Sequence, residues 1–283
     1  MTVSLTKSST SSSTSSSTSS STSSSTSSST SSFTSTSSFT PVVHSEWLKI
    51  RSVRSLGVTL ASVFLATVGF SLLLSATLST EETAKPDFDP LLSSFFGIDF
   101  GQIAAICFGA LAVAGEYKSG AIRISLAVVP RRGVLYAAKL AVIGGLALLV
   151  GLATSLTCFL AGQAFLGDRG VGIGDPGALR AVVGCGIYLA LITLFSAGLA
   201  AVLRSGPAVM GILIPFLLMV SFVIGDVSQD DSVVEFLPDR AGRQALLQES
   251  TGVLGPWTGL GVLGIWVAAA LWAGWQSLHR RDA

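Results

Sequence analysis

The sequence predicts an all-α integral membrane protein with six transmembrane helices, a cytoplasmic interfacial helix before the first of them and a cytoplasmic coupling segment after the second. Three observations predict this class. Six long apolar runs follow a polar N-terminal tail, charged residues fall almost entirely between the runs, and basic residues gather on alternate connections. Only 12% of the residues are charged and the mean hydropathy is +0.68, which is typical of membrane proteins and not of soluble domains.

The apolar runs are long enough to cross a membrane as helices. Most reach or approach the ~20 residues that a transmembrane α-helix needs. They are continuously apolar rather than alternating, which favours helices over the strands of a closed barrel. The six runs are Gly57–Leu78, Phe100–Ala114, Leu140–Leu166, Ala181–Leu203, Pro207–Gly225 and Gly255–Gln276. With their connections they form a predicted transmembrane domain over residues 56–278.

Basic residues are distributed unequally between the two sides of the predicted membrane. With both termini in the cytoplasm, the inner side holds eleven of the 17 Lys and Arg residues and the outer side five. Acidic residues mostly lie outside, in or near the predicted outer loops 79–97, 167–177 and 226–254. Because basic residues accumulate on cytoplasmic loops, the sequence predicts a cytoplasmic N-terminus and cytoplasmic C-terminal residues 279–283. The opposite orientation is the alternative.

Residues 1–40 are a Ser/Thr-rich tract that repeats Thr-Ser-Ser-Ser between Thr10 and Thr30. The tract has almost no apolar content, so it cannot offset the entropy lost on ordering, and it is predicted to be a disordered tail. A glycosylated stalk is the alternative, and it would require the outside orientation that the charges oppose.

Residues 41–55 read PVVHSEWLKIRSVRS and are predicted to form a short amphipathic helix at the cytoplasmic interface. Trp47 offers apolar contact with the membrane, and nearby basic side chains can meet anionic head groups. The candidate interfacial residues are Glu46, Trp47, Lys49, Arg51 and Arg54. The alternative is that this stretch is only the polar flank of the first span.

Residues 115–139, GEYKSGAIRISLAVVPRRGVLYAAK, form the most informative inner segment. They carry five basic residues around the apolar centre Ile122–Val129, which is too short to span a membrane. The pattern predicts a helix at the inner membrane face, a break at Pro130 and then the lead into the third span. A solvated basic loop that merely orients the protein is the alternative.

Features of the later chain refine the predicted bundle. The connection Arg204–Pro207 is a tight inner turn, and Pro215 inside the fifth run is expected to kink that helix. In loop 226–254, apolar residues near Phe236 and Leu246 are predicted to support a short surface helix. The GxxxG spacings at Gly97 and Gly255 indicate close helix packing within the chain, with a dedicated dimer face as the alternative.

Several kinds of site are missing from the sequence. No charged residue lies clearly at mid-membrane, whereas ion-coupled carriers usually hold an intramembrane ionisable group there. The three cysteines, Cys107, Cys158 and Cys185, fall within apolar runs and are expected to stay free, and no metal-ligand spacing occurs. No phosphate-binding loop and no hydrolase motif occurs either, so the chain is expected not to be an enzyme.

Three stretches resemble a known family. Ser45–Ser55 is similar to the SEWxKxRSxRS opening of permease subunits of exporter-type ABC transporters, common in actinobacteria. Gly115–Arg123 resembles the family's GEYxxGxIR, and Val129–Gly133 with Lys139 resembles its xPRRxxxxxxK. The similarity covers roughly residues 42–283, and its specific motifs lie only between residues 45 and 139.

The resemblance implies a bacterial plasma-membrane permease with six spans that works as two halves. The second half is another copy of this chain or a paralogue, and membrane lipids surround both; no nucleic acid partner is implied. The chain itself is expected to bind no cofactor, while a separate cytoplasmic subunit binds ATP and Mg²⁺ and hydrolyses the ATP. The candidate ATPase-coupling residues are Glu116, Tyr117, Lys118, Gly120, Arg123, Pro130, Arg131 and Arg132.

The sequence also allows two alternative interpretations of its function. A membrane anchor or immunity protein that moves nothing would share the spans and the topology but would need no ATPase. A secondary carrier is disfavoured by the missing intramembrane charge and by the absence of an obvious inverted repeat of discontinuous helices. The residues do not identify a substrate, although apolar span surfaces fit export of a hydrophobic or amphipathic molecule.

Overall fold

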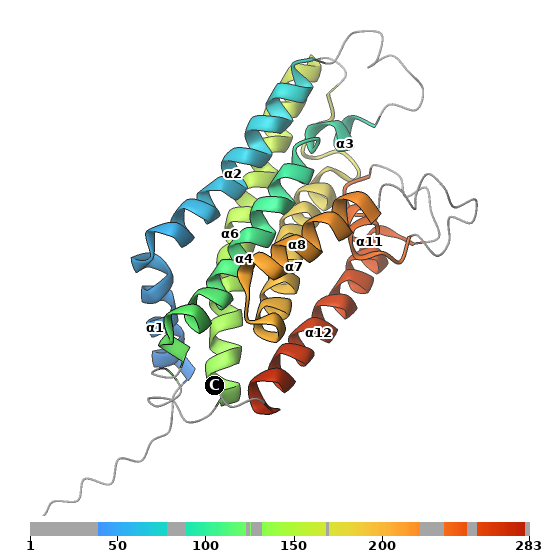
Figure 1. The fold of residues 1–283 in the computed structure, drawn as a ribbon. Coiled ribbons are helices and arrows are strands. Elements are labelled where there is room, and N and C mark those ends of the chain that lie inside the picture. The colour runs from blue at the N-terminus through green and yellow to red at the C-terminus, as the bar shows by residue number, and fades with distance from the viewer. Residues whose placement is uncertain are drawn as a thin grey trace, which may run out of the picture. The chain divides into compact units, whose positions relative to one another are not determined.

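A computed structural model describes residues 39–77, 89–122, 125, 132–167, 170–220, 235–247 and 254–280. The predicted disordered tail lies almost entirely outside these residues. Within the described residues the fold is helical and contains no strand (Figure 1). The helices are α1 (Phe39–Ser52), α2 (Arg54–Ser75), α3 (Pro90–Ser94), α4 (Ile98–Ser119), α6 (Arg132–Leu166), α7 (Ala178–Leu203), α8 (Gly206–Pro215), α11 (Pro238–Arg243) and α12 (Pro256–Arg280).

Five of the helices are long and apolar enough to cross a membrane: α2, α4, α6, α7 and α12. This confirms the all-helical, multi-pass character that the sequence predicts. The fifth apolar run is represented by the shorter α8 and by a π-helical turn, Phe216–Val220, that follows Pro215 directly. Residues 221–225 lie outside the described part of the chain, so six crossings stay a prediction.

The helix boundaries show how the inner segment 115–139 is built. α4 does not end at Ala114 but continues through Glu116 to Ser119, and it stops at Gly120, whose φ of 71° is a left-handed value that suits glycine. Ala121, Ile122 and Ser125 are again helical. α6 begins at Arg132, so Lys139 lies about two turns inside a 35-residue helix rather than ahead of it.

α7 lies at the centre of the bundle and packs against α4, α6 and α12. The apolar windows of α4 and α7 are each 67% buried, whereas those of α2, α6 and α12 are 22–33% buried. The large side chains enclosed at this centre include Phe108, Tyr188 and Ile192. α2, α6 and α12 therefore supply most of the apolar outer surface, as expected for helices that face lipid.

Small residues bring the helices together inside the chain. The backbone N–H of Gly97 donates a hydrogen bond to Ser71 Oγ of α2 at 2.9 Å, and Gly101 packs on Thr67 of the same helix. Gly259 at the start of α12 packs on the backbone of Ala241 in α11. Both GxxxG spacings thus serve packing within the chain, as the sequence indicates.

Replacing Gly109 of α4 by Ala is expected to destabilise the bundle by about 1–3 kcal/mol, because the added methyl group would overlap the backbone carbonyl of Thr193 in α7. The matched control is Gly69→Ala in α2, where nothing lies within 4 Å of the added carbon. Unfolding of the detergent-solubilised variants in SDS, followed by tryptophan fluorescence, measures both. Equal stability of the two variants would contradict the α4–α7 packing.

The bundle has two chemically different ends. One end, called the basic end, is formed by α1, the C-terminal ends of α4, α7 and α12 and the N-terminal end of α6; there Arg132 Nη1 donates to the Leu278 carbonyl at 2.9 Å. The opposite end carries Asp99, Asp175 and Asp239 and is called the acidic end. In the orientation that the sequence predicts, the basic end would face the cytoplasm.

The sequence predicts a short surface helix in loop 226–254. The short helix found there, α11, is largely buried instead. α11 closes the acidic end of the bundle against α7 and α12, and Ala241, Ala245 and Leu246 around it are fully buried. Apolar residues of the loop are therefore part of the core. The cysteines are free, as expected.

Candidate functional site

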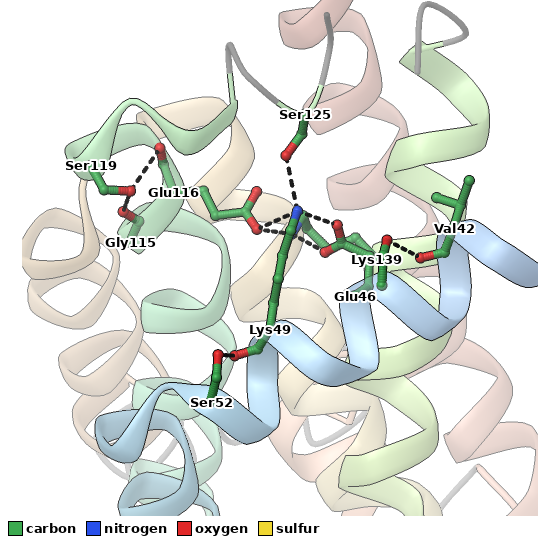
Figure 2. Close-up of polar contacts among 10 residues, drawn as sticks. Val42, Glu46, Lys49, Ser52, Gly115, Glu116, Ser119, Ser125 and Lys139 are labelled. Carbon is green, nitrogen blue, oxygen red and sulfur yellow. Dashed lines mark hydrogen bonds and ion pairs between the residues drawn. The ribbon is translucent and has the colours of Figure 1, made fainter. Parts of the chain in front are cut away.

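Four charged side chains meet at the basic end of the bundle (Figure 2). Glu46 and Lys49 come from α1, Glu116 from the last turn of α4 and Lys139 from the first turns of α6. Together they are called the ion network. It joins α1, α4 and α6, which are far apart in the sequence.

Lys139 is the centre of the ion network. Its Nζ donates to Glu46 Oε2 and to Glu116 Oε1, both at 2.5 Å. Lys49 Nζ donates to Glu46 Oε1 at 2.6 Å and lies 3.6 Å from Glu116 Oε1. Lys49 also donates to Ser125 Oγ at 2.9 Å, which ties the segment after α4 to the same group.

Three of the four side chains of the ion network are largely buried, which makes an unpaired charge there unfavourable. The side chains of Glu46, Lys139 and Glu116 are only 1%, 8% and 15% exposed, while Lys49 is 39% exposed. Two carboxylates and two ammonium groups give no net charge, so the cluster as a whole is tolerated in a poorly solvated place. Loss of any single partner would leave an uncompensated buried charge, which is costly.

The pKa values of the two α1 residues follow from these contacts. Burial by itself raises the pKa of Glu46, but the attraction and hydrogen bonds of Lys139 and Lys49 outweigh it and hold that pKa below its ordinary value. Burial by itself lowers the pKa of Lys49, but its bonds to Glu46 and its attraction to Glu116 raise it overall. Both α1 residues therefore keep their charges around neutral pH.

One atom of the ion network lacks a donor among the described residues. Glu116 Oε2 is buried without a hydrogen-bond partner there. The network lines a cavity of about 430 Å³ between α1, α4 and α6, walled by apolar residues such as Leu111 and Ile143. The last turn of α4 therefore has free space beside it on this flank.

The other predicted site residues are placed as follows. Trp47 and Arg51 lie on the exposed face of α1, and Arg54, also exposed, starts α2, so these three remain available for the membrane interface. The sequence predicts that Lys49 meets head groups, but the structure turns it into the ion network because α1 buries the face of Val42 and Glu46.

The inner segment also contains residues outside the ion network. The Arg204 guanidinium lies 5.1 Å from the centre of the Tyr117 ring, and Lys118 is exposed. Arg132 binds the end of α12. Arg123, Pro130 and Arg131 lie outside the described residues. α8 ends as a regular α-helix at Pro215, the position of the expected kink.

A second polar cluster lies at the acidic end. Arg243 of α11 donates to Asp239 Oδ1 at 3.1 Å and forms an ion pair with Asp99 of α4. The Tyr188 hydroxyl of α7 donates to Asp239 Oδ1 at 2.5 Å and also lies against the Gln102 amide. Burial by itself lowers the pKa of Arg243. The pKa is nevertheless raised overall, because the guanidinium interacts electrostatically with Tyr188, Asp239 and Asp99. This cluster fastens α11 to two spans.

Sequence reasoning missed the partners that complete both clusters. Lys139 ended one of the quoted motifs, but only its place inside α6 shows that it faces Glu46 and Glu116. Asp239 and Arg243 are four residues apart, a spacing that favours an ion pair if the loop is helical. Tyr188 gave no signal beyond being a polar aromatic residue in an apolar run.

The clusters hold ion pairs rather than a recognisable catalytic or metal-binding group. Within the described ranges, no three His, Cys, Asp or Glu side chains come together in a way that could hold a metal ion. The chain matches no protein-family model and no curated protein sequence. The two clusters and the topology of the bundle are therefore the features of the chain that bear on its function.

Proposed function

We propose that the chain is the membrane-spanning permease subunit of an ATP-driven transporter in the bacterial plasma membrane, with ATP hydrolysed by a separate subunit at the basic end. The ion network carries this proposal. A force applied to the inner segment at Glu116 reaches α1 and α6 directly, because Lys139 bonds Glu116 and Glu46 at 2.5 Å each.

The surroundings of α4 support a mechanical role for its last turns. Leu111, Gly115 and Ser119 line the cavity of about 430 Å³ beside the ion network. The same three residues line a second cavity of about 880 Å³ toward the α7–α8 turn. With a cavity on both flanks and a left-handed glycine directly after it, we expect this end of the helix to tilt more easily than the packed turns before it.

The proposed mechanism links the partner to the spans. Closure of the ATP-bound partner dimer pushes on the segment after Gly120, and the end of α4 moves as a lever. The ion network carries α1 and α6 along. The second span and the fifth, which is interrupted at Pro215, then shift across the axis between two permease copies and open an outward path for a hydrophobic or amphipathic substrate.

The test is co-expression with the ATPase encoded nearest to this chain, purification by a tag on the permease, and measurement of ATPase activity. Stable co-purification with activity is expected. Glu116→Gln should leave the complex assembled but lower the permease-stimulated activity, by about tenfold if one charge-assisted hydrogen bond transmits the movement.

The matched control is Glu235→Gln, the same substitution at the acidic end of the bundle, which should leave the activity unchanged. Melting curves of both complexes separate lost coupling from lost folding. Unchanged activity of the Glu116 variant would remove the coupling role. A well-folded permease that retains no ATPase would favour a non-transporting anchor or immunity protein.

A further inference from the structure

The second cavity, of about 880 Å³, has features that the proposed function does not use. It lies between the last turns of α4 and the turn that joins α7 to α8, and it is called the basic cavity. Its size falls in the range of small-molecule sites, which is roughly 300–1,000 Å³. Its polar lining comes from Tyr117, Lys118, Ser119, Arg204 and Ser205, and no acidic residue is among the described residues that line it.

Charge and apolar surface are separated within the basic cavity. Lys118 is in the last turn of α4 and Arg204 directly follows α7, so both cations lie where an apolar span ends. Leu111 and Met210 line the cavity further along α4 and α8. Leu111 is seven residues before Lys118, about 10 Å deeper into the bundle. A ligand with an anionic head and an apolar tail would match both parts.

Arg204 is held in an unusual backbone conformation. Among the described residues it is the only non-glycine with positive φ, at 53°. A bulky side chain there costs roughly 1–2 kcal/mol relative to a right-handed conformation, and glycine would not carry that cost. The guanidinium packs on the Tyr117 ring at 5.1 Å, which aims it along the cavity wall. An arginine kept at such a position is a candidate for a functional role of its side chain.

Lys118 supplies a second positive charge. It is exposed and has no ion-pair partner among the described residues, in contrast to Lys49 and Lys139. The acidic neighbour Glu116 is bonded to Lys139 on the other flank of α4. Among the described residues, no carboxylate is therefore paired with the Lys118 ammonium at the basic cavity.

We infer that the basic cavity binds an anionic phospholipid, with the phosphate between Lys118 and Arg204 and the start of an acyl chain against Leu111 and Met210. The site lies at the end of two spans, where phospholipid head groups are found. Guanidinium and ammonium groups both bind phosphate oxygens through charge-assisted hydrogen bonds. This inference does not depend on the transporter proposal.

The test uses the purified full chain in a neutral detergent and native mass spectrometry with added phosphatidylglycerol or phosphatidylcholine. One phosphatidylglycerol molecule should be retained at lower lipid concentration than any phosphatidylcholine. The double variant Lys118→Gln, Arg204→Gln should weaken that first binding step by about tenfold or more. The control Arg280→Gln, an exposed arginine at the same end of the bundle, should change it less than about twofold.

Arg204→Gly separates binding from folding. Glycine is favoured at this φ, which offsets the lost contact of the guanidinium with the Tyr117 ring, so the variant should still unfold cooperatively and yet lose phosphatidylglycerol binding. Unchanged binding in the double variant, equal binding of phosphatidylcholine, or an equal loss in Arg280→Gln would overturn the inference. Displacement of the lipid by millimolar inorganic phosphate would show a site for free phosphate and would overturn the lipid assignment.

Discussion

Replacing Lys139 by Met is expected to destabilise the bundle by about 3–5 kcal/mol, because it leaves Glu46 and Glu116 buried without their shared cation. Methionine fills nearly the same volume, so the effect reports charge rather than packing. SDS unfolding of the detergent-solubilised chain, followed by tryptophan fluorescence, measures the loss. The control is Lys118→Met, at an exposed lysine without an ion pair among the described residues, which should change stability by no more than about 0.5 kcal/mol.

A double substitution sharpens this prediction. Adding Glu46→Gln to Lys139→Met removes one of the two stranded carboxylates and leaves Glu116 with Lys49, 3.6 Å away. The double variant should therefore be more stable than Lys139→Met alone, although each single change is destabilising. Additive losses would mean that the two side chains do not interact, and the ion network would then be wrong.

Arg243→Met is expected to release α11 from the acidic end of the bundle. The change leaves Asp239, which is 5% exposed, without its cation and removes the ion pair to Asp99. Because Arg243 is itself 29% exposed, we expect a loss of about 2–3 kcal/mol, below that of a fully buried pair. Hydrogen exchange should show the amides of α11 losing protection while those of α1 keep theirs.

Two companion variants test the cause of that release. Tyr188→Phe keeps the ring in the core and removes only the hydroxyl that donates to Asp239, so a smaller loss of about 1 kcal/mol is expected. Arg280→Met, an exposed arginine at the opposite end, should leave α11 protected. If α11 exchanges no faster in Arg243→Met than in Arg280→Met, its apolar contacts alone hold it in place.

Predictions from the sequence were strongest where a long pattern repeats. Continuous apolar runs predicted helices at α2, α4, α6, α7 and α12, and only the ends moved, by as many as eight residues at the start of α6. The ends moved because polar residues such as Glu116 and Lys139 continue the helix beyond the apolar run when they find partners at its margin. The fifth run shows the limit of this pattern, since α8 ends at Pro215.

The order of the residues is enough to predict which segments are apolar, where basic residues gather and where glycine and proline interrupt the helices. These are local properties of composition and backbone. The packing of the helices was needed to show that Glu46 turns inward to Lys139, that Arg243 reaches Asp99 and that Arg204 lies over Tyr117. Such pairs join residues as many as 144 positions apart, and helix packing alone brings their side chains within a few ångströms.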